Sequence, residues 1–182
     1  MRKTLLMAGL LYGFLAGAQN YALSSNMADL ADMGTINLEL SCGLARHWSL
    51  SAGAKYNPFT YGEPGPSQAQ DRQRLFSLGA RWWPWHVWSG WWLSAKWQYQ
   101  EFNTGGIRSP LTEEGDRFGG GIGAGYAWML SPHFNLDVGL GGWAGYGRTV
   151  TYACPRCGRI VDSGRGFFLL PNDLLFSITY IF

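Results

Sequence analysis

Charged residues, long apolar runs and cysteine are all scarce in this 182-residue chain. Charged side chains form 14% of it, against roughly 25% in soluble domains. Beyond the N-terminus, no run approaches the roughly 20 apolar residues of a membrane-spanning helix. The net charge is only +2, and Arg2 and Lys3 account for that excess. This balance gives no reason to expect nucleic acid as a partner.

Glycine and aromatic residues are abundant instead, with 26 glycines and 16% aromatics. That glycine content is about twice the usual share. The first residues, "MRKTLLMAGLLYGFLAGA", combine a positive start, an apolar stretch and a small-residue end. This pattern predicts a secretory signal peptide over residues 1–18, cleaved before Gln19. Residues 19–182 would then form a single domain of strands in contact with lipid.

Alternation of apolar and polar residues recurs along the mature chain. In "FNLDVGLGGWAGY", Phe134, Leu136 and Val138 share one face, while Asn135 and Asp137 share the other. Such a period of two is typical of a strand with one buried face. Eight segments show it: 21–28, 36–44, 48–56, 75–83, 91–100, 117–128, 134–146 and 173–182. Because their apolar faces carry almost no charge, we predict an all-β fold, an eight-stranded antiparallel transmembrane (outer-membrane) β-barrel.

The connections between these segments support the same architecture. In an outer-membrane barrel, periplasmic turns are short and external loops are long. The second, fourth and sixth connections are short, at 45–47, 84–90 and 129–133. The third, fifth and seventh are long, at roughly 57–71, 102–116 and 147–168. The first connection, "DLADMG", is the exception because it is short where a long external loop is expected.

Aromatic residues gather near the ends of the predicted strands, where they would sit at the membrane interfaces. The stretch "RWWPWHVWSGWW" at 81–92 holds six tryptophans and a strand-ending Pro84, and we expect it at headgroup level. A patch that contacts a partner protein is the alternative. The terminal strand ends in an aromatic residue, which resembles the signal read by the barrel-insertion machinery. The predicted interface aromatics are Trp48, Trp82, Trp91, Trp128, Phe134 and Phe182 at one rim and Tyr56, Tyr99, Phe118 and Tyr146 at the other.

Ionisable residues occupy several inward positions of the predicted barrel. Eight strands enclose a lumen just wide enough for side chains, and charges buried there must be paired. We therefore predict an ion-pair network that fills the lumen. A narrow gated pore is the alternative, and single-channel recording distinguishes the two. The predicted network residues are Glu39, Lys55, Arg81, Lys96, Arg117 and Asp137.

The motif "YACPRCGRI" places Cys154 and Cys157 in the last external connection. A disulfide between them suits an exported loop. A metal site is a weak alternative because zinc usually needs four ligands, and Cys42 lies on a strand elsewhere. A redox-active dithiol is the third possibility. His47, His86 and His133 all map to the opposite, periplasmic turns.

Other candidates for chemistry are few, and we predict a non-enzymatic protein without a cofactor or metal. Lipid-modifying outer-membrane enzymes use His with Ser near the outer face, where no histidine maps here. Glu113 and Glu114 lie in a polar connection, where solvation is their simplest role. Arginine side chains suit anionic outer-leaflet lipid or plain solvent equally well. Four lie near the last connection: Arg148, Arg156, Arg159 and Arg165.

Four stretches of the chain are distinctive, namely "ARHWSLSAGAKYNPFTY", "SPHFNLDVGLGGWAGY", "YACPRCG" and "FSITYIF". Together they resemble a family of small outer-membrane barrel proteins from Bacteroidetes that bears a domain-of-unknown-function label, DUF3575. The resemblance implies an outer-membrane barrel, and some relatives are thought to accompany fimbrial genes. It carries no catalytic residues. "HFNLDVGLG" is also similar to the membrane domain of OmpA-type proteins. The resulting prediction is a structural or surface-interaction role with lipid and a surface or fimbrial protein as partners.

Overall fold

The computed structural model describes residues 20–63, 68–107, 109–156 and 158–182, with Asn172 described by its backbone alone. The predicted signal peptide, residues 1–18, and Cys157 lie outside these ranges. Within them, no helix is long and apolar enough to cross a membrane. The elements are β1 (Tyr21–Asn26), α2 (Met27–Ala31), β2 (Ile36–Ala45), β3 (Trp48–Asn57), β4 (Thr60–Tyr61), β5 (Ala69–Trp82), β6 (Gly90–Gly105), β7 (Thr112–Met129), β8 (Phe134–Tyr152) and β9 (Ile160–Ile181).

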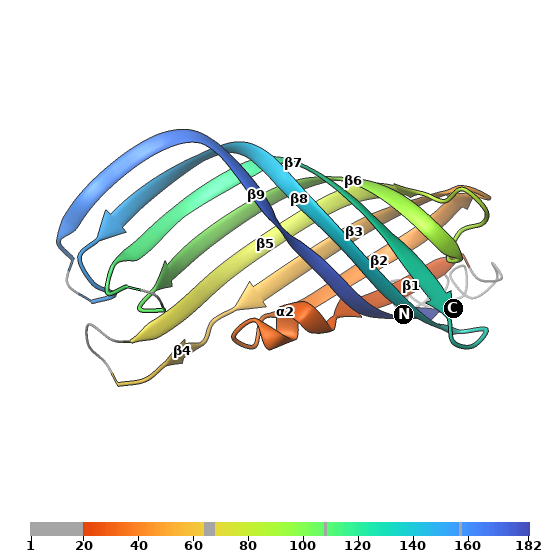
Figure 1. Ribbon diagram of the computed structural model, residues 1–182, viewed down its shortest axis with the longest axis horizontal. Helices are drawn as coiled ribbons and strands as arrows, with labels where there is room; N and C mark the ends of the chain where they lie inside the picture. Colours follow the sequence, from red (N-terminus) through yellow and green to blue (C-terminus); the bar gives the residue numbers. More distant parts are fainter. Residues whose placement is uncertain (1–19, 64–67, 108, 157) are drawn as a thin grey trace, which may run out of the picture.

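The long strands form one closed antiparallel barrel (Figure 1). Neighbours in the sheet follow the order β3-β2-β1-β9-β8-β7-β6-β5, and β3 also pairs with β5 to close the ring. The two-residue strand β4 pairs with β5 outside this ring. An eight-stranded antiparallel barrel is therefore confirmed, and each alternating segment of the sequence corresponds to one of its strands.

The two ends of the barrel differ in height. At one end, which we call the turn end, short turns follow β2, β5 and β7, and Phe182 N–H donates to the carbonyl of Tyr21 at 2.9 Å. At the other, the hairpin end, β6 to β9 extend well past β1 and β2 (Figure 1). The expectation of long loops at 102–116 and 147–168 was therefore wrong. Most of these residues continue the β6–β7 and β8–β9 ladders, because backbone pairing persists after the apolar alternation stops.

The first connection, which was an exception in the sequence, contains the short helix α2. Asn26 is its N-cap, and the Asn26 side chain accepts a hydrogen bond from Ala28 N–H at 3.2 Å. The same carboxamide also donates to Leu174 O and accepts from Phe176 N–H, both at 2.9 Å. It therefore continues the β1–β9 ladder beyond the last backbone pair, at one of the two short seams that β1 forms in the barrel wall.

The outer wall is apolar, and aromatic side chains lie at both of its edges. Near the turn end, Trp48, Trp91 and Trp128 are about half exposed. Toward the hairpin end, strand pairing aligns one cross-strand aromatic row, which consists of Phe76, Tyr99, Phe118, Tyr146 and Phe167. The next outward positions form a charged row, which consists of Arg74, Glu101, Asp116, Arg148 and Arg165. The apolar wall therefore ends abruptly at one cross-strand level.

Candidate functional site

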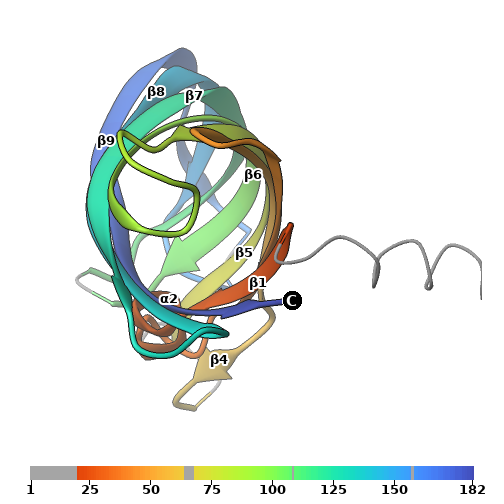
Figure 2. The ribbon, with the colours of Figure 1, turned by 90° about the vertical axis from the view of Figure 1, so that its right-hand side faces the viewer.

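The turn between β5 and β6 folds into the barrel and closes its turn end (Figure 2). Trp83 and Trp92 are each only 1% exposed, and Val87 and Trp88 are also buried. The Trp83 indole N–H donates to Ser49 Oγ at 3.0 Å, and the Trp83 and Trp88 rings meet edge to face with centroids 5.8 Å apart. We call these four side chains the tryptophan plug.

One residue of the plug adopts a costly backbone conformation. Trp88 has φ of 70°, a left-handed region in which a bulky side chain is destabilised by about 1–3 kcal/mol. Asn135, which is 1% exposed, donates its side-chain N–H to the carbonyl of Trp88 at 2.5 Å. The neighbouring wall thus holds the turn in its inward conformation.

The tryptophan cluster of the sequence is therefore split between two environments. Trp82, Trp85 and Trp91 lie on the outside, where they are 38%, 71% and 62% exposed. The expectation that the whole cluster sits at headgroup level was wrong for Trp83, Trp88 and Trp92, which lie in the lumen. Tryptophan suits both places because its ring is largely apolar and its N–H needs one partner.

Three cations and three carboxylates fill the middle of the barrel. One oxygen of the Glu39 carboxylate accepts a hydrogen bond from the Arg81 guanidinium at 2.6 Å, and the other oxygen lies 3.7 Å from Lys96 Nζ. Asp173 lies 3.6 Å from Lys96 and 3.9 Å from Lys55. The third carboxylate, Asp29 of α2, is 2.8 Å from Lys55. This ion network is neutral in total, as burial of charge in a narrow lumen requires.

Four of the predicted lumen residues belong to this network, namely Glu39, Lys55, Arg81 and Lys96. Asp173 and Asp29 were not predicted. Asp173 is the first residue of the alternating segment 173–182. It lies two residues before the buried Leu175, so the alternation places both side chains on the inward face. Asp29 had no comparable signal because α2 has only five residues.

The other two predicted residues, Arg117 and Asp137, face the lumen without joining the network. Arg117 Nε donates to Gln100 Oε1 at 2.8 Å, and its guanidinium lies 4.4 Å from the Phe102 ring and 5.4 Å from the Trp143 ring. Asp137, 2% exposed, accepts from the Thr179 hydroxyl at 2.5 Å. Its other carboxylate oxygen has no hydrogen-bond partner among the described residues.

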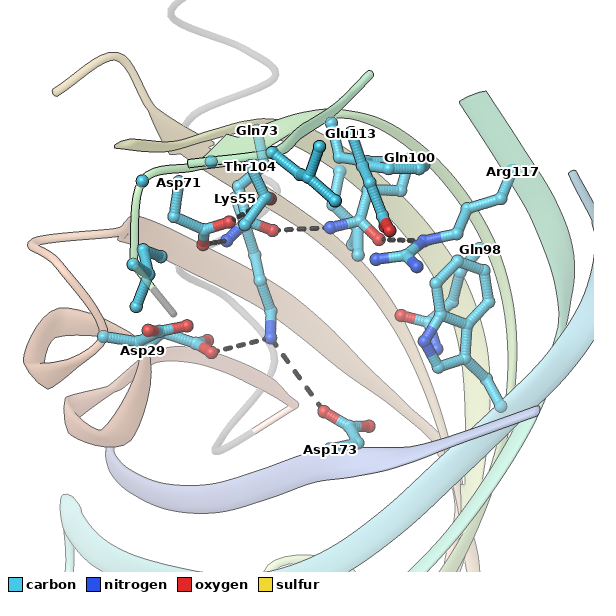
Figure 3. A pocket seen from close by; sticks show the side chains of 18 of the residues that line it. Asp29, Lys55, Asp71, Gln73, Gln98, Gln100, Thr104, Glu113, Arg117 and Asp173 are labelled. Atoms are coloured by element: carbon cyan, nitrogen blue, oxygen red, sulfur yellow. Dashed lines mark hydrogen bonds and ion pairs between the residues drawn. The ribbon is translucent and has the colours of Figure 1, made fainter. Parts of the chain in front are cut away.

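Above the network, toward the hairpin end, the lumen opens into a polar cavity of about 560 Å³, which we call the cup (Figure 3). A chain of side-chain hydrogen bonds runs around its wall. Thr104 donates to Asp71 at 2.5 Å, Gln73 donates to Asp71 at 2.8 Å, and Gln100 donates to Gln73 at 2.6 Å. The ionisable residues that line the cup are Asp29, Asp32, Asp71, Glu113, Asp173, Lys55 and Arg117.

Electrostatic crowding is evident at Asp32, in the connection that follows α2. Partial desolvation raises the pKa of the Asp32 carboxyl above its ordinary value. Repulsion from Asp71 and Asp29 raises it further, and attraction to Lys55 offsets part of the increase. The upper part of the cup therefore favours an additional positive charge.

The remaining candidates lie outside the lumen. Cys154 is disulfide-bonded and Cys42 is free. Cys157, the expected partner of Cys154, lies outside the described residues, so this pairing stays a prediction. Among the residues that the structure describes, no group of three or more His, Cys, Asp or Glu side chains could hold a metal ion.

The histidines and loop arginines do not line the cup. Each histidine ring bonds to a backbone carbonyl at the turn end, His47 to Trp83 at 2.9 Å, His86 to Val87 at 3.0 Å and His133 to Ile181 at 2.9 Å. Arg148 and Arg165 pair across β8 and β9 on the outer wall. Arg156 and Arg159 are exposed near the hairpin tip.

The predicted interface aromatics all lie on the outer wall. The most exposed is Trp91 at 62%, and the least exposed is Trp82 at 38%. Between these values lie Trp48, Trp128, Phe134, Tyr56, Tyr99, Phe118, Tyr146 and Phe182.

Residues 4–182 match the model of a family described as "Protein of unknown function (DUF3575)". No curated protein matches the chain.

Proposed function

Because the chain belongs to the DUF3575 family of proteins of unknown function, we propose its role from its structure alone. The protein is a non-enzymatic outer-membrane β-barrel of a Gram-negative bacterium with a closed interior. Its part above the membrane serves a structural or surface-contact role in the cell envelope. The proposal also includes the two relationships that the sequence suggested, one to proteins from Bacteroidetes and one to the membrane domain of OmpA-type proteins.

The observation that carries the proposal is the apolar outer wall. Large hydrophobic side chains such as Leu78, Ile122 and Leu140 are 66%, 77% and 69% exposed, although a water-soluble protein would bury them. The aromatic row and the charged row mark where the wall would pass from acyl chains to headgroups. A closed barrel satisfies every backbone group of such a wall through its neighbours.

The orientation follows from the predicted signal peptide and the turns. A secreted chain with an even number of barrel strands keeps both termini and the short turns in the periplasm. The hairpin end and the cup then face the cell exterior. Phe182 ends the last strand at the periplasmic side, where the barrel-insertion machinery would read it.

A filled lumen favours an anchor over a channel. The tryptophan plug closes the periplasmic end, and the Glu39–Arg81 and Lys96–Asp173 pairs cross the middle. An ion would have to displace both layers to pass. A narrow porin-like channel therefore ranks second, and a lipid-modifying enzyme ranks third.

Two features above the aromatic row support contact at the surface. Arg148 and Arg165 lie next to each other at the predicted headgroup level, where guanidinium groups suit the phosphates of outer-leaflet lipid. The strand β9 pairs with β1 only through Ser177–Ile181, so its upper part has an unpaired edge among the described residues. An unpaired edge accepts an extended segment of another protein. A fimbrial or other envelope protein is the partner we propose for it.

Membrane fractionation of cells that express the full chain tests the location. We expect the mature protein in the outer-membrane fraction, with a gel mobility that shifts on heating because the folded barrel resists detergent. A protein that stays folded and dissolved without detergent would refute the proposal.

Planar-bilayer recording tests the closed interior. We expect no steady single-channel steps from the purified barrel, and reproducible steps would favour the porin alternative. Mass analysis of lipopolysaccharide from cells with and without the gene tests the enzyme alternative. A mass difference that depends on the gene would favour it.

A further inference from the structure

We propose that the cup binds an extended organic cation with two or more amino groups, such as an aliphatic oligoamine. This goes beyond the proposed anchoring role, because it depends on the folded barrel and not on a surface partner.

The first reason is an excess of negative charge that has no ion-pair partner among the described residues. Lys55 is already engaged by Asp29 and Asp173. Asp32, Asp71 and Glu113 have no ion pair with any described residue. Arg117 is hydrogen-bonded to Gln100 and lies against two aromatic rings, and it attracts Asp71 and Glu113 without forming an ion pair within 4 Å.

Carboxylates outnumber cations around the cup even when Arg108 is added to the cations. Five carboxylates and two cations line the cup. Arg108 stands between the lining residues Ile107 and Ser109 in the chain and lies outside the described ranges. Lys96, below the cup, also pairs with the lining residue Asp173. Counting the charges of Arg108 and Lys96 in full still leaves the acids in the majority, so the site favours a cationic ligand.

The second, independent reason is Gln98. This residue is only 5% exposed, yet its amide lines the cup and forms no side-chain hydrogen bond with another described residue. Figure 3 shows it beside Arg117 on the cavity wall. Its amide atoms are open to the cavity and are not among the fully buried polar atoms that lack a partner. The Gln98 carbonyl oxygen is therefore free to accept an N–H from a ligand that enters the cup.

The spacing of the acids selects an organic cation over a metal ion. No three acidic or other ligating side chains in the described part of the chain converge on one point, whereas a divalent metal needs several oxygens within about 2.6 Å. A chain that carries amino groups at intervals can reach separate carboxylates. The apolar residues of the wall, Leu75, Phe102 and Trp143, can contact the methylene groups between them.

The size of the cup fits such a ligand. Its volume of about 560 Å³ lies within the roughly 300–1,000 Å³ of typical small-molecule sites. Because the cup is open toward the hairpin end, the ligand would enter from the exterior and stop at the ion network.

Isothermal titration calorimetry with spermidine, on the folded full-length mature barrel in detergent, tests the proposal. We expect saturable binding with one site per barrel. Removing two carboxylates with the double variant Asp71→Asn/Glu113→Gln should weaken it at least tenfold, equal to about 1.4 kcal/mol. The matched control is Asp116→Asn, which removes a carboxylate from the outer face of the same strand as Glu113 and should leave the affinity unchanged.

A second variant separates a built site from general attraction between charges. Gln98→Leu keeps every charge, and we expect it to weaken spermidine binding several-fold. Circular dichroism and the heat-shifted gel mobility verify that each variant is folded. Equal affinity for all four proteins, or displacement of spermidine by an equal concentration of Mg²⁺, would overturn the proposal.

Discussion

Replacing Glu39 by glutamine tests whether the ion network stabilises the barrel. The substitution keeps the size of the side chain and removes one negative charge from between two cations. Arg81, at 2.6 Å, is 5% exposed, and Lys96, at 3.7 Å, is 10% exposed. After the change, Lys96 keeps its ion pair with Asp173, but the Arg81 guanidinium has no carboxylate within 4 Å among the described residues.

The expected loss follows from that uncompensated charge. Removing one partner of a buried ion pair typically destabilises a protein by about 3–5 kcal/mol, because the other charge stays desolvated. The stacking of Arg81 on Trp92, with 4.8 Å from the guanidinium carbon to the ring centroid, offsets part of this loss. We therefore expect the free energy of unfolding to fall by about 3 kcal/mol.

Urea unfolding of the barrel in lipid vesicles, followed by tryptophan fluorescence, measures this change. The double variant Glu39→Gln/Arg81→Gln restores charge balance between Lys96 and Asp173 and should be more stable than Glu39→Gln alone. A fall below about 1 kcal/mol, or strictly additive effects of the two substitutions, would show that water reaches Arg81 and that the lumen is not sealed.

Three further predictions concern the plug, the seam and the cup. Trp83→Ala should lower the free energy of unfolding by about 3–5 kcal/mol, because it leaves a cavity and unpairs the Ser49 hydroxyl; urea unfolding measures this, and an effect below 1 kcal/mol would contradict the plug. Asn26→Leu should raise amide hydrogen exchange at Phe176, whose N–H loses its acceptor, and unchanged exchange would contradict the role of that carboxamide. Spermidine affinity should rise with pH as Asp32, whose pKa is raised, loses its proton; Asp32→Asn should remove that part of the pH dependence measured by calorimetry.

The sequence predicts the strands well wherever one face is apolar and the other polar. Residues 134–146 alternate cleanly, and β8 includes all of them. The strand then continues to Tyr152, although Arg148–Tyr152 shows no contrast between faces. Beyond the charged row, water can reach both faces of the hairpin, so composition no longer distinguishes a strand from a loop. Only the pairing of β8 with β9 reveals it.

The direction of the β5–β6 turn could not be predicted for a different reason. Pro84 and the Ser89–Gly90 pair interrupt the alternation, so no period assigns Trp88 to a face, and Trp83 is only the last residue of the alternating segment 75–83, on the same face as Arg81. Their residue type is equally compatible with headgroups and with a packed lumen. The inward position depends on distant partners, Ser49 on β3 and Asn135 on β8, which only the closed barrel brings together.

The candidate site was predictable in the part that the strands build. Alternation along a strand places neighbouring side chains on opposite faces, so Arg81 and Lys96 face inward where Trp82 and Trp97 face outward. The cup was not predicted as a site, since Asp71 and Glu113 fall in segments that were expected to be loops. Their positions follow from the continued β5–β6–β7 pairing.

The level of the aromatic row also separates two electrostatic regimes inside the barrel. On β5, Arg81 lies on the turn side of Phe76 and Asp71 lies on the hairpin side. The turn side holds the core of the ion network, in which every charge has a partner within 4 Å. The hairpin side holds the carboxylates that form no ion pair with any other residue the structure describes. In the outer-membrane location that we propose, acyl chains surround the turn side, and a narrow lumen has to be neutralised by its own side chains because no water replaces a missing partner. Beyond the proposed headgroup level, water stabilises an excess of like charge, and the protein can retain it for the cation that we propose as ligand.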